Sequence, residues 1–138
     1  MKLQINIAAP LLVAVAFAIA TPAWARADPT YVGVTVGYQA TGAPRGMPYV
    51  SKTAAGAREG AMQNCRAHLV ACASAGTSTQ CIGIATGVGT KWMSAEGPDR
   101  QTAEANARAK LDELVAGLPL PDTAGVDPAT TAACAWDQ

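Results

Sequence analysis

The only histidine of the chain, His68, is close in sequence to two cysteines, Cys65 and Cys72. A cysteine three or four residues from a histidine on one helical face can form a dyad, in which the imidazole takes the thiol proton. Such a dyad would suit a small hydrolase. Two features count against it. Residues 1–27 have the features of a secretory leader, and thiols of exported chains are typically oxidised; in addition, partners on one helix leave nothing opposite them to hold a substrate. A solvent-facing structural histidine is the favoured interpretation.

Two further patterns have both a chemical and a structural interpretation. Glu96 and Asp99 flank a Gly-Pro turn and could act as a glycosidase carboxylate pair, but Asp99 also stands where a helix needs an N-cap. The stretch GIATGVGTK, residues 83–91, suggests a phosphate loop, yet it matches neither standard phosphate-loop pattern and opens no helix. A hairpin turn is favoured there. We therefore predict no catalytic residue, no cofactor and no metal site.

The four cysteines of the chain are Cys65, Cys72, Cys81 and Cys134. An even number in a short exported chain is typical of two disulfides. A four-thiolate zinc site is the alternative, but zinc knuckles space their cysteines two to four residues apart, and the gaps here are seven, nine and fifty-three. Spacing alone leaves three disulfide pairings open.

Four aromatic residues are candidates for contact with a partner. A tryptophan can fill the core of an alanine-rich domain, whereas an exposed one beside a tyrosine can anchor an interface. The candidates are Tyr31, Tyr49, Trp92 and Trp136.

The elements that carry these residues follow from periodicity. Alternating valines over residues 31–38 predict a half-buried strand, and the prolines and glycines of 39–48 predict a turn. Ser51 is the candidate N-cap of an alanine-rich helix, and a loop is expected over 73–80. Glycines within that helix predict close packing on its neighbour. Its apolar stripe consists of Ala54, Ala57, Ala61, Met62, Cys65 and Leu69.

A similar order follows in the second half of the chain. Residues 81–95 predict a hairpin, Asp99 caps a second alanine-rich helix that ends at Gly117, and 131–136 form a short last strand. The pattern predicts a duplicated strand-helix-strand unit. The expected fold is α+β, with both helices packed on one face of a small, mostly antiparallel sheet and disulfides stabilising it; a ferredoxin-like split βαβ is the nearest named arrangement.

Residues 1–27 have the features of a secretory signal peptide. Lys2 precedes an apolar run, and small residues offer cleavage before Arg26 or, as favoured, before Asp28. The run is shorter than the roughly 20 apolar residues of a confident membrane span. Residues 28–138 then form a single exported domain with a net charge of −2. That charge argues against a nucleic-acid partner or an anionic membrane.

Several of these features together resemble a known family. They are the alanine-rich helix ending in Cys65, the nearby Cys72, the CxGxAxG strand of 81–87, Trp92, and a turn into a second alanine-rich helix. Residues 30–136 are similar to the domain of unknown function 4189 family of small exported actinobacterial proteins, and the start DPTYVG is similar to exported mycobacterial proteins. The resemblance implies an exported protein of undetermined function.

The chain departs from the family pattern in the second unit. Family members usually carry cysteines in and after the second helix, where this chain has Leu114 and AGLPLPD. A Gly/Trp-rich strand of the family is also reduced to TKWMSAEG. Because the two cysteines are missing together, the resemblance implies that their counterparts, Cys65 and Cys72, are paired. Cys81 would then pair with Cys134.

The Cys65–Cys72 pairing restricts how far the first helix can extend. Seven helical residues separate Cα atoms by about 10 Å, beyond the roughly 7 Å reach of a disulfide, so the helix must end near His68. An unbroken helix would instead give a Cys72 to Cys81 bridge and a Cys65 to Cys134 bridge.

The expected function is that of a non-enzymatic exported module that binds a protein or an envelope component, acting in the cell envelope or outside the cell. Export, disulfides, internal duplication and the weak catalytic signals favour it. The alternatives are a small envelope hydrolase, an inhibitor of an enzyme, and a structural protein whose helices mediate self-association.

Overall fold

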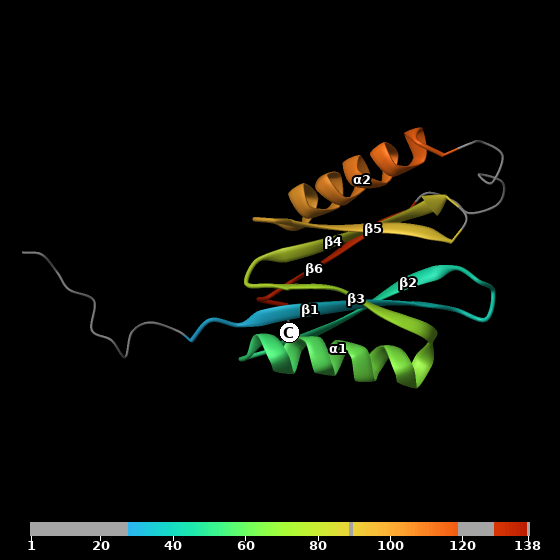
Figure 1. Cartoon of the computed structure of the whole chain (residues 1–138). Coiled ribbons are helices and arrows are strands. Elements are labelled where there is room, and N and C mark those ends of the chain that lie inside the picture. The colour runs from blue at the N-terminus through green and yellow to red at the C-terminus, as the bar shows by residue number, and fades with distance from the viewer. Residues whose placement is uncertain (1–27, 89, 119–128, 138) are drawn as a thin grey trace, which may run out of the picture.

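The computed structural model describes residues 28–88, 90–118 and 129–137 (Figure 1). The predicted signal peptide and its cleavage site therefore lie outside or at the border of the described residues. The elements follow the order β1 (Tyr31–Tyr38), β2 (Pro44–Ser51), α1 (Ala54–His68), β3 (Val70–Ser78), β4 (Cys81–Val88), β5 (Lys91–Gly97), α2 (Arg100–Ala116) and β6 (Ala129–Cys134).

The described strands form two antiparallel sheets of three strands each. Their orders are β2-β1-β3 and β5-β4-β6. Figure 1 shows the sheets facing each other, with α1 on the outer face of the first and α2 on the outer face of the second. The α+β class with two disulfides is confirmed. The prediction of one sheet carrying both helices on one face is wrong, because there are two sheets and each carries one helix.

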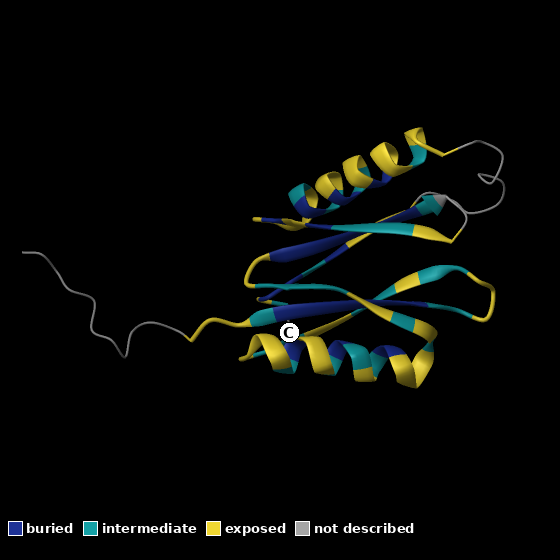
Figure 2. Cartoon of the chain, in the orientation of Figure 1, coloured by how far each residue is buried: buried dark blue, intermediate teal, exposed yellow. Residues whose placement is uncertain are grey.

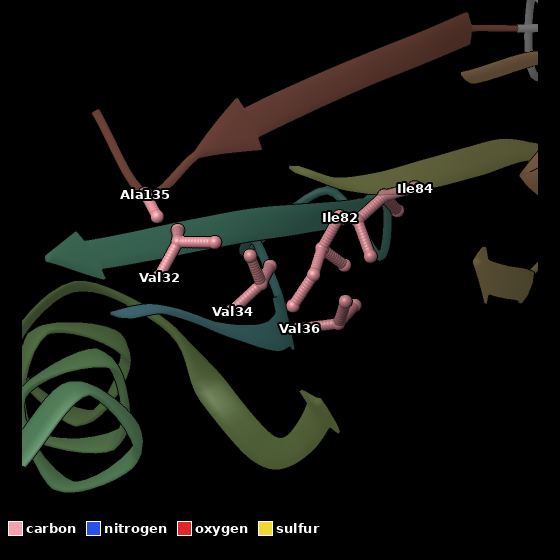
Figure 3. Close-up of a cluster of buried hydrophobic side chains, with 6 residues drawn as sticks. All are labelled: Val32, Val34, Val36, Ile82, Ile84 and Ala135. Carbon is pink, nitrogen blue, oxygen red and sulfur yellow. The ribbon is translucent and has the colours of Figure 1, made fainter. Parts of the chain in front are cut away.

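The composition of the two central strands explains the four layers. Branched residues of β1 and β4 point between the sheets and form the main core, where Figure 3 shows Val32, Val34, Val36, Ile82, Ile84 and Ala135. The alternate positions hold glycine or other small residues, over which the helices lie. Both faces of each central strand are therefore buried, as Figure 2 shows for β1 and β4. A strand buried on both faces needs a partner layer on each side.

The predicted duplication is present, with one strand more per copy than the predicted strand-helix-strand unit. Each copy is a hairpin, a helix and a return strand, and in each the first strand becomes the centre of its sheet. The buried face of α1 is Ala57, Ala61 and Cys65, and that of α2 is Ala103, Ala107 and Leu111. Small residues at matching places let both helices lie close to their sheets.

The turn predicted over residues 39–48 is wrong in its second half, because β2 begins at Pro44. Proline lacks the N–H that a strand interior needs, but β2 is an edge strand, so Pro44 and Pro48 can turn that side to solvent. The N-cap of α1 is Thr53 instead of the predicted Ser51, since the Thr53 hydroxyl accepts a bond from the Gly56 amide at 3.0 Å. The predicted loop over 73–80 is mostly strand β3.

The second half of the chain follows its predictions more closely. Asp99 caps α2 and accepts a bond from the Thr102 amide at 2.7 Å, while Gly117 is the C-cap. The hairpin of β4 and β5 and the short last strand are also present, although β6 begins and ends two residues earlier than predicted. The first helix ends at His68, as the predicted disulfide pairing requires.

Candidate contact surface between the sheets

All four cysteines are in disulfides, and the pairing implied by the family resemblance is confirmed. Cys65 is bonded to Cys72 with a Cα–Cα distance of 6.1 Å, and Cys81 to Cys134 with 4.0 Å. The helix end at His68 lets the chain return in β3, which resolves the distance objection. The zinc alternative and the pairing that needs an unbroken helix are both wrong. Within the described part of the chain, no group of three or more His, Cys, Asp or Glu residues could hold a metal ion.

The structure does not form the dyad considered for His68. Its side chain is exposed, and Nδ1 lies 2.9 Å from the carbonyl oxygen of Asn64, one helical turn earlier. Cys65 and Cys72, the two thiols within reach in sequence, are bonded to each other. The arrangement seen here is therefore structural.

The carboxylates considered as a glycosidase pair have structural surroundings. Both oxygens of Asp99 interact with Thr102 at the start of α2, through its amide and its hydroxyl. Glu96 is exposed, and its backbone carbonyl accepts a bond from Asn106 at 3.0 Å. The glycine-rich stretch belongs to the β4–β5 hairpin. The hairpin interpretation is therefore confirmed, in preference to a phosphate loop.

The four candidate contact aromatics separate into two groups. Trp92 is half-buried and packs against the core between the sheets, opposite Thr86 at the far end of β4. The other three are carried at the end of the molecule where β1 begins and β2 and β6 finish. Tyr31 opens β1, Tyr49 is 47% exposed near the end of β2, and Trp136 is 57% exposed just after β6.

A hollow of about 420 Å³ lies between β2 and β6, near the end of the molecule where these two strands finish. It continues into a smaller apolar space of about 50 Å³, with Pro48 and Ala133 lining both. The space exists because the edges of the two sheets carry small or short side chains, among them Gly46 and Ala133, where they face each other. The residues lining the larger hollow are Pro48, Tyr49, Val50, Ala133 and Asp137.

Hydrogen bonds position the chain end that carries Trp136. Arg100 on α2 donates to the carbonyl oxygen of Ala132 in β6 and forms an ion pair with Asp137. The other carboxylate oxygen of Asp137 accepts a bond from the Cys134 amide at 2.7 Å. These contacts fix the residues on both sides of Trp136, so an exposed indole is presented from an ordered segment.

A second hollow of about 390 Å³ lies on the opposite side, between β3 and β5. Its lining is more polar: the Ser94 hydroxyl donates to the carbonyl oxygen of Ala75 at 2.9 Å, and Glu96 and Lys110 lie at its rim. It holds none of the exposed aromatics, which makes the β2–β6 hollow the better candidate for contact. Both hollows depend on which strands face each other, so the sequence pattern carries no signal for them.

Comparison with known proteins gives no relative: no family model, no curated protein and no solved structure matches the chain. The resemblance to the domain of unknown function 4189 family therefore stays a prediction. Among the helices of the described residues, none has the length and apolar character needed to cross a membrane.

Proposed function

We propose that the protein is an exported, non-enzymatic binding module, and that its contact surface is the β2–β6 hollow together with Tyr49 and Trp136. The observation that carries the proposal is that two exposed aromatic residues border an open, largely apolar hollow: Tyr49 is one of its lining residues, and Trp136 directly precedes Asp137, which is another. Tyrosine and tryptophan are enriched among the residues that dominate binding energy, because they bury large areas at low entropic cost.

The way in which both aromatics are held supports binding. The Tyr49 ring rests on the backbone of Gly60 in α1, since a Cβ on Gly60 would lie 2.3 Å from the ring. Trp136 is carried by the segment that Arg100 and Asp137 hold. Side chains already ordered before contact lose less conformational entropy when a partner binds.

Export is part of the same proposal. The leader-like residues 1–27 support it, and two disulfides are compatible with an oxidising compartment. The partner would be a protein or an envelope component. Inhibition of an envelope enzyme is one form that such binding could take, whereas the arrangement around His68 gives no support to the hydrolase alternative.

Photo-crosslinking in the producing cells tests the proposal. Trp136 is replaced by a photoreactive phenylalanine derivative, and Leu118 is replaced in the same way as the control. Leu118 is an apolar residue, 38% exposed, at the opposite end of the molecule just after α2. We expect a discrete product from position 136 and none from 118, and a Tyr49→Ala change should weaken it. No product at 136, or the same product from both positions, would refute the proposed surface.

A further inference from the structure

The two disulfides differ in how far solvent reaches them. Cys65, Cys81 and Cys134 are fully buried, whereas Cys72 is partly exposed. Cys72 lies near the start of β3, an edge strand that is paired with β1 on one side. Thiol–disulfide exchange needs a thiolate to reach one of the two bonded sulfurs, so access decides which bond can react. Among the four half-cystines, Cys72 is the one that is not fully buried.

A β-bulge directs Cys72 toward α1. Val36 is paired with Ala73 and Tyr38 with Val70, so Ala71 and Cys72 together face Gly37 alone. The disulfide lies directly over Gly37, because a Cβ there would be 2.5 Å from the Cys65 Sγ and 3.1 Å from the Cys72 Sγ.

The same bulge holds a strained residue. Ala71 has φ of 52°, in the left-handed region where an alanine Cβ crowds the following carbonyl. The covalent bridge to Cys65 starts at the very next residue, so it fixes the chain in this conformation. Reduction removes that constraint, and relief of the strain favours the reduced form.

Cys81–Cys134 is protected by its surroundings. The two residues are directly paired in β4 and β6, and they form a buried cluster with Ala103 of α2 and Ala132. In addition, Arg100 holds α2 to β6 through the Ala132 carbonyl. An attacking thiol can reach neither sulfur while α2 stays in place.

We propose that Cys65–Cys72 is a thiol–disulfide exchange site that a dithiol reduces by attack on Cys72, while Cys81–Cys134 stays oxidised. One thiolate of the dithiol attacks the Cys72 Sγ and forms a mixed disulfide, and Cys65 leaves as a thiolate that takes up a proton. The second thiol of the dithiol then attacks the first sulfur of the same reagent molecule, which is bonded to Cys72 in the mixed disulfide. Cys72 is released as a thiolate and takes up a proton. Two electrons pass from the dithiol, which becomes a disulfide.

Reduction acts on the first unit alone because the two helices are held differently. Four side chains of α2 donate to strand carbonyls, namely those of Arg100, Asn106, Arg108 and Lys110. Within the described residues, α1 makes no such bond to its sheet, and the disulfide joins its last turn to β3. Loss of the bridge therefore loosens the end of α1 and the bulge, and leaves the second sheet intact.

Timed reduction of the folded, oxidised protein tests the proposal. The protein is treated with dithiothreitol without denaturant, quenched with an alkylating agent and digested with trypsin, which separates Cys65 from Cys72 by cutting after Arg66. We expect Cys65 and Cys72 to become alkylated at least about a hundredfold faster than Cys81 and Cys134, because three of the four sulfurs are inaccessible. Cys81–Cys134 is the internal control, since reduction through global unfolding would open both bonds at one rate.

A monothiol identifies the sulfur that is attacked. Glutathione cannot complete the second step within one molecule, so it should leave a mixed disulfide on Cys72 and a free thiol on Cys65. Amide hydrogen exchange of the product should show faster exchange at the end of α1 and the start of β3, with β4 to β6 unchanged. Equal reduction rates for the two bonds, or glutathione attached to Cys65, would overturn the proposal.

Discussion

Gly33 of β1 lies directly beneath the carbonyl group of Ala57 in α1, so that a Cβ on Gly33 would be 2.3 Å from the Ala57 oxygen. Gly83 of β4 has the same relationship to Ala103 of α2, at 2.2 Å. This repeated contact between strand and helix backbones sets the spacing between each helix and its sheet. It also explains why alanine fills both helix faces, because a larger residue would hold the helix away.

Replacement of either glycine by alanine should destabilise the fold. The new methyl group would meet rigid backbone, so Gly33→Ala and Gly83→Ala should each lower the free energy of unfolding by about 3 kcal/mol, as overpacking does. Gly46→Ala is the matched control: its Cβ would lie 3.4 Å from Ile84, an apolar side chain that lines the smaller space between the sheets. Urea denaturation measures all three, and a loss for Gly46→Ala equal to the others would contradict this account.

Thr35 is fully buried beneath α1, and among the described residues its hydroxyl has no hydrogen-bond partner. In the other unit, Ala85 packs at the corresponding place against Ala107 and Leu111. A buried hydroxyl without a partner costs about 1–3 kcal/mol, so the isosteric change Thr35→Val should raise the free energy of unfolding by about 1 kcal/mol. Thr86→Val is the control, because the Thr86 hydroxyl donates to the carbonyl of Ala129. Stabilisation by Thr86→Val as large as that by Thr35→Val would count against this explanation.

The fold of the second unit could be predicted in more detail than that of the first. Asp99 and Gly117 mark the ends of α2 by capping, which is local chemistry that a sequence displays directly. β3 shows no alternating pattern because its pairing with β1 is interrupted by two register shifts, so successive residues do not keep to two faces. The prolines of β2 are typical of turns, and they are tolerated only because that strand lies at an edge.

The residue pattern of the two central strands indicates that the strands divide into two sheets. Valine alternates with glycine in β1 and isoleucine with small residues in β4, which indicates one face packed by side chains and the other by helix backbone. No sequence pattern indicates the contact surface. Tyr49 and Trp136 are far apart in sequence, and the hollow exists only because β2 and β6 face each other in the fold. Residues such as Val50 and Asp137 therefore could not be assigned to it.

The Tyr49 ring depends on Gly60 for its position. Gly60→Ala places a methyl group 2.3 Å from the ring, which can rotate away because it is a side chain on an edge strand. Alanine is also a better helix former by about 1 kcal/mol, so we expect the free energy of unfolding to change by less than about 1 kcal/mol. The crosslink formed from position 136 should nevertheless weaken, since Tyr49 is displaced. An unchanged crosslink would show that the position of Tyr49 does not matter to contact.

Asp137 makes two different contacts, and substitutions can separate them. Asp137→Ala removes the ion pair with Arg100 and leaves the Cys134 amide without its acceptor, so we expect a loss of about 1–2 kcal/mol in unfolding free energy. Asp137→Asn keeps an acceptor oxygen and should cost about half as much. The fluorescence anisotropy of Trp136, measured in a background that carries both Trp24→Phe and Trp92→Phe, should fall with Asp137→Ala. Equal effects of the two substitutions would contradict a role for the Cys134 amide bond.

Ala71 occupies the left-handed position of the bulge opposite Gly37, with φ of 52°. In the most common bulge of this kind that position holds glycine, because a Cβ there costs about 1–2 kcal/mol. Ala71→Gly removes that strain but gives the unfolded chain more freedom, so a net stabilisation of about 0.5–1 kcal/mol is expected in thermal or urea unfolding of the oxidised protein.

Ala73→Gly is the matched control, since Ala73 is an exposed residue of the same strand, paired with Val36, and does not have a positive φ. At position 73 the change to glycine gives the unfolded chain more conformational freedom but removes no strain from the folded state. It should therefore lower the free energy of unfolding by about 0.5–1 kcal/mol. Ala71→Gly should also make the Cys65–Cys72 bond harder to reduce at equilibrium, because less strain is released when the bridge opens. Opposite signs for the two substitutions are the decisive result, and destabilisation by both would mean that Ala71 is not strained.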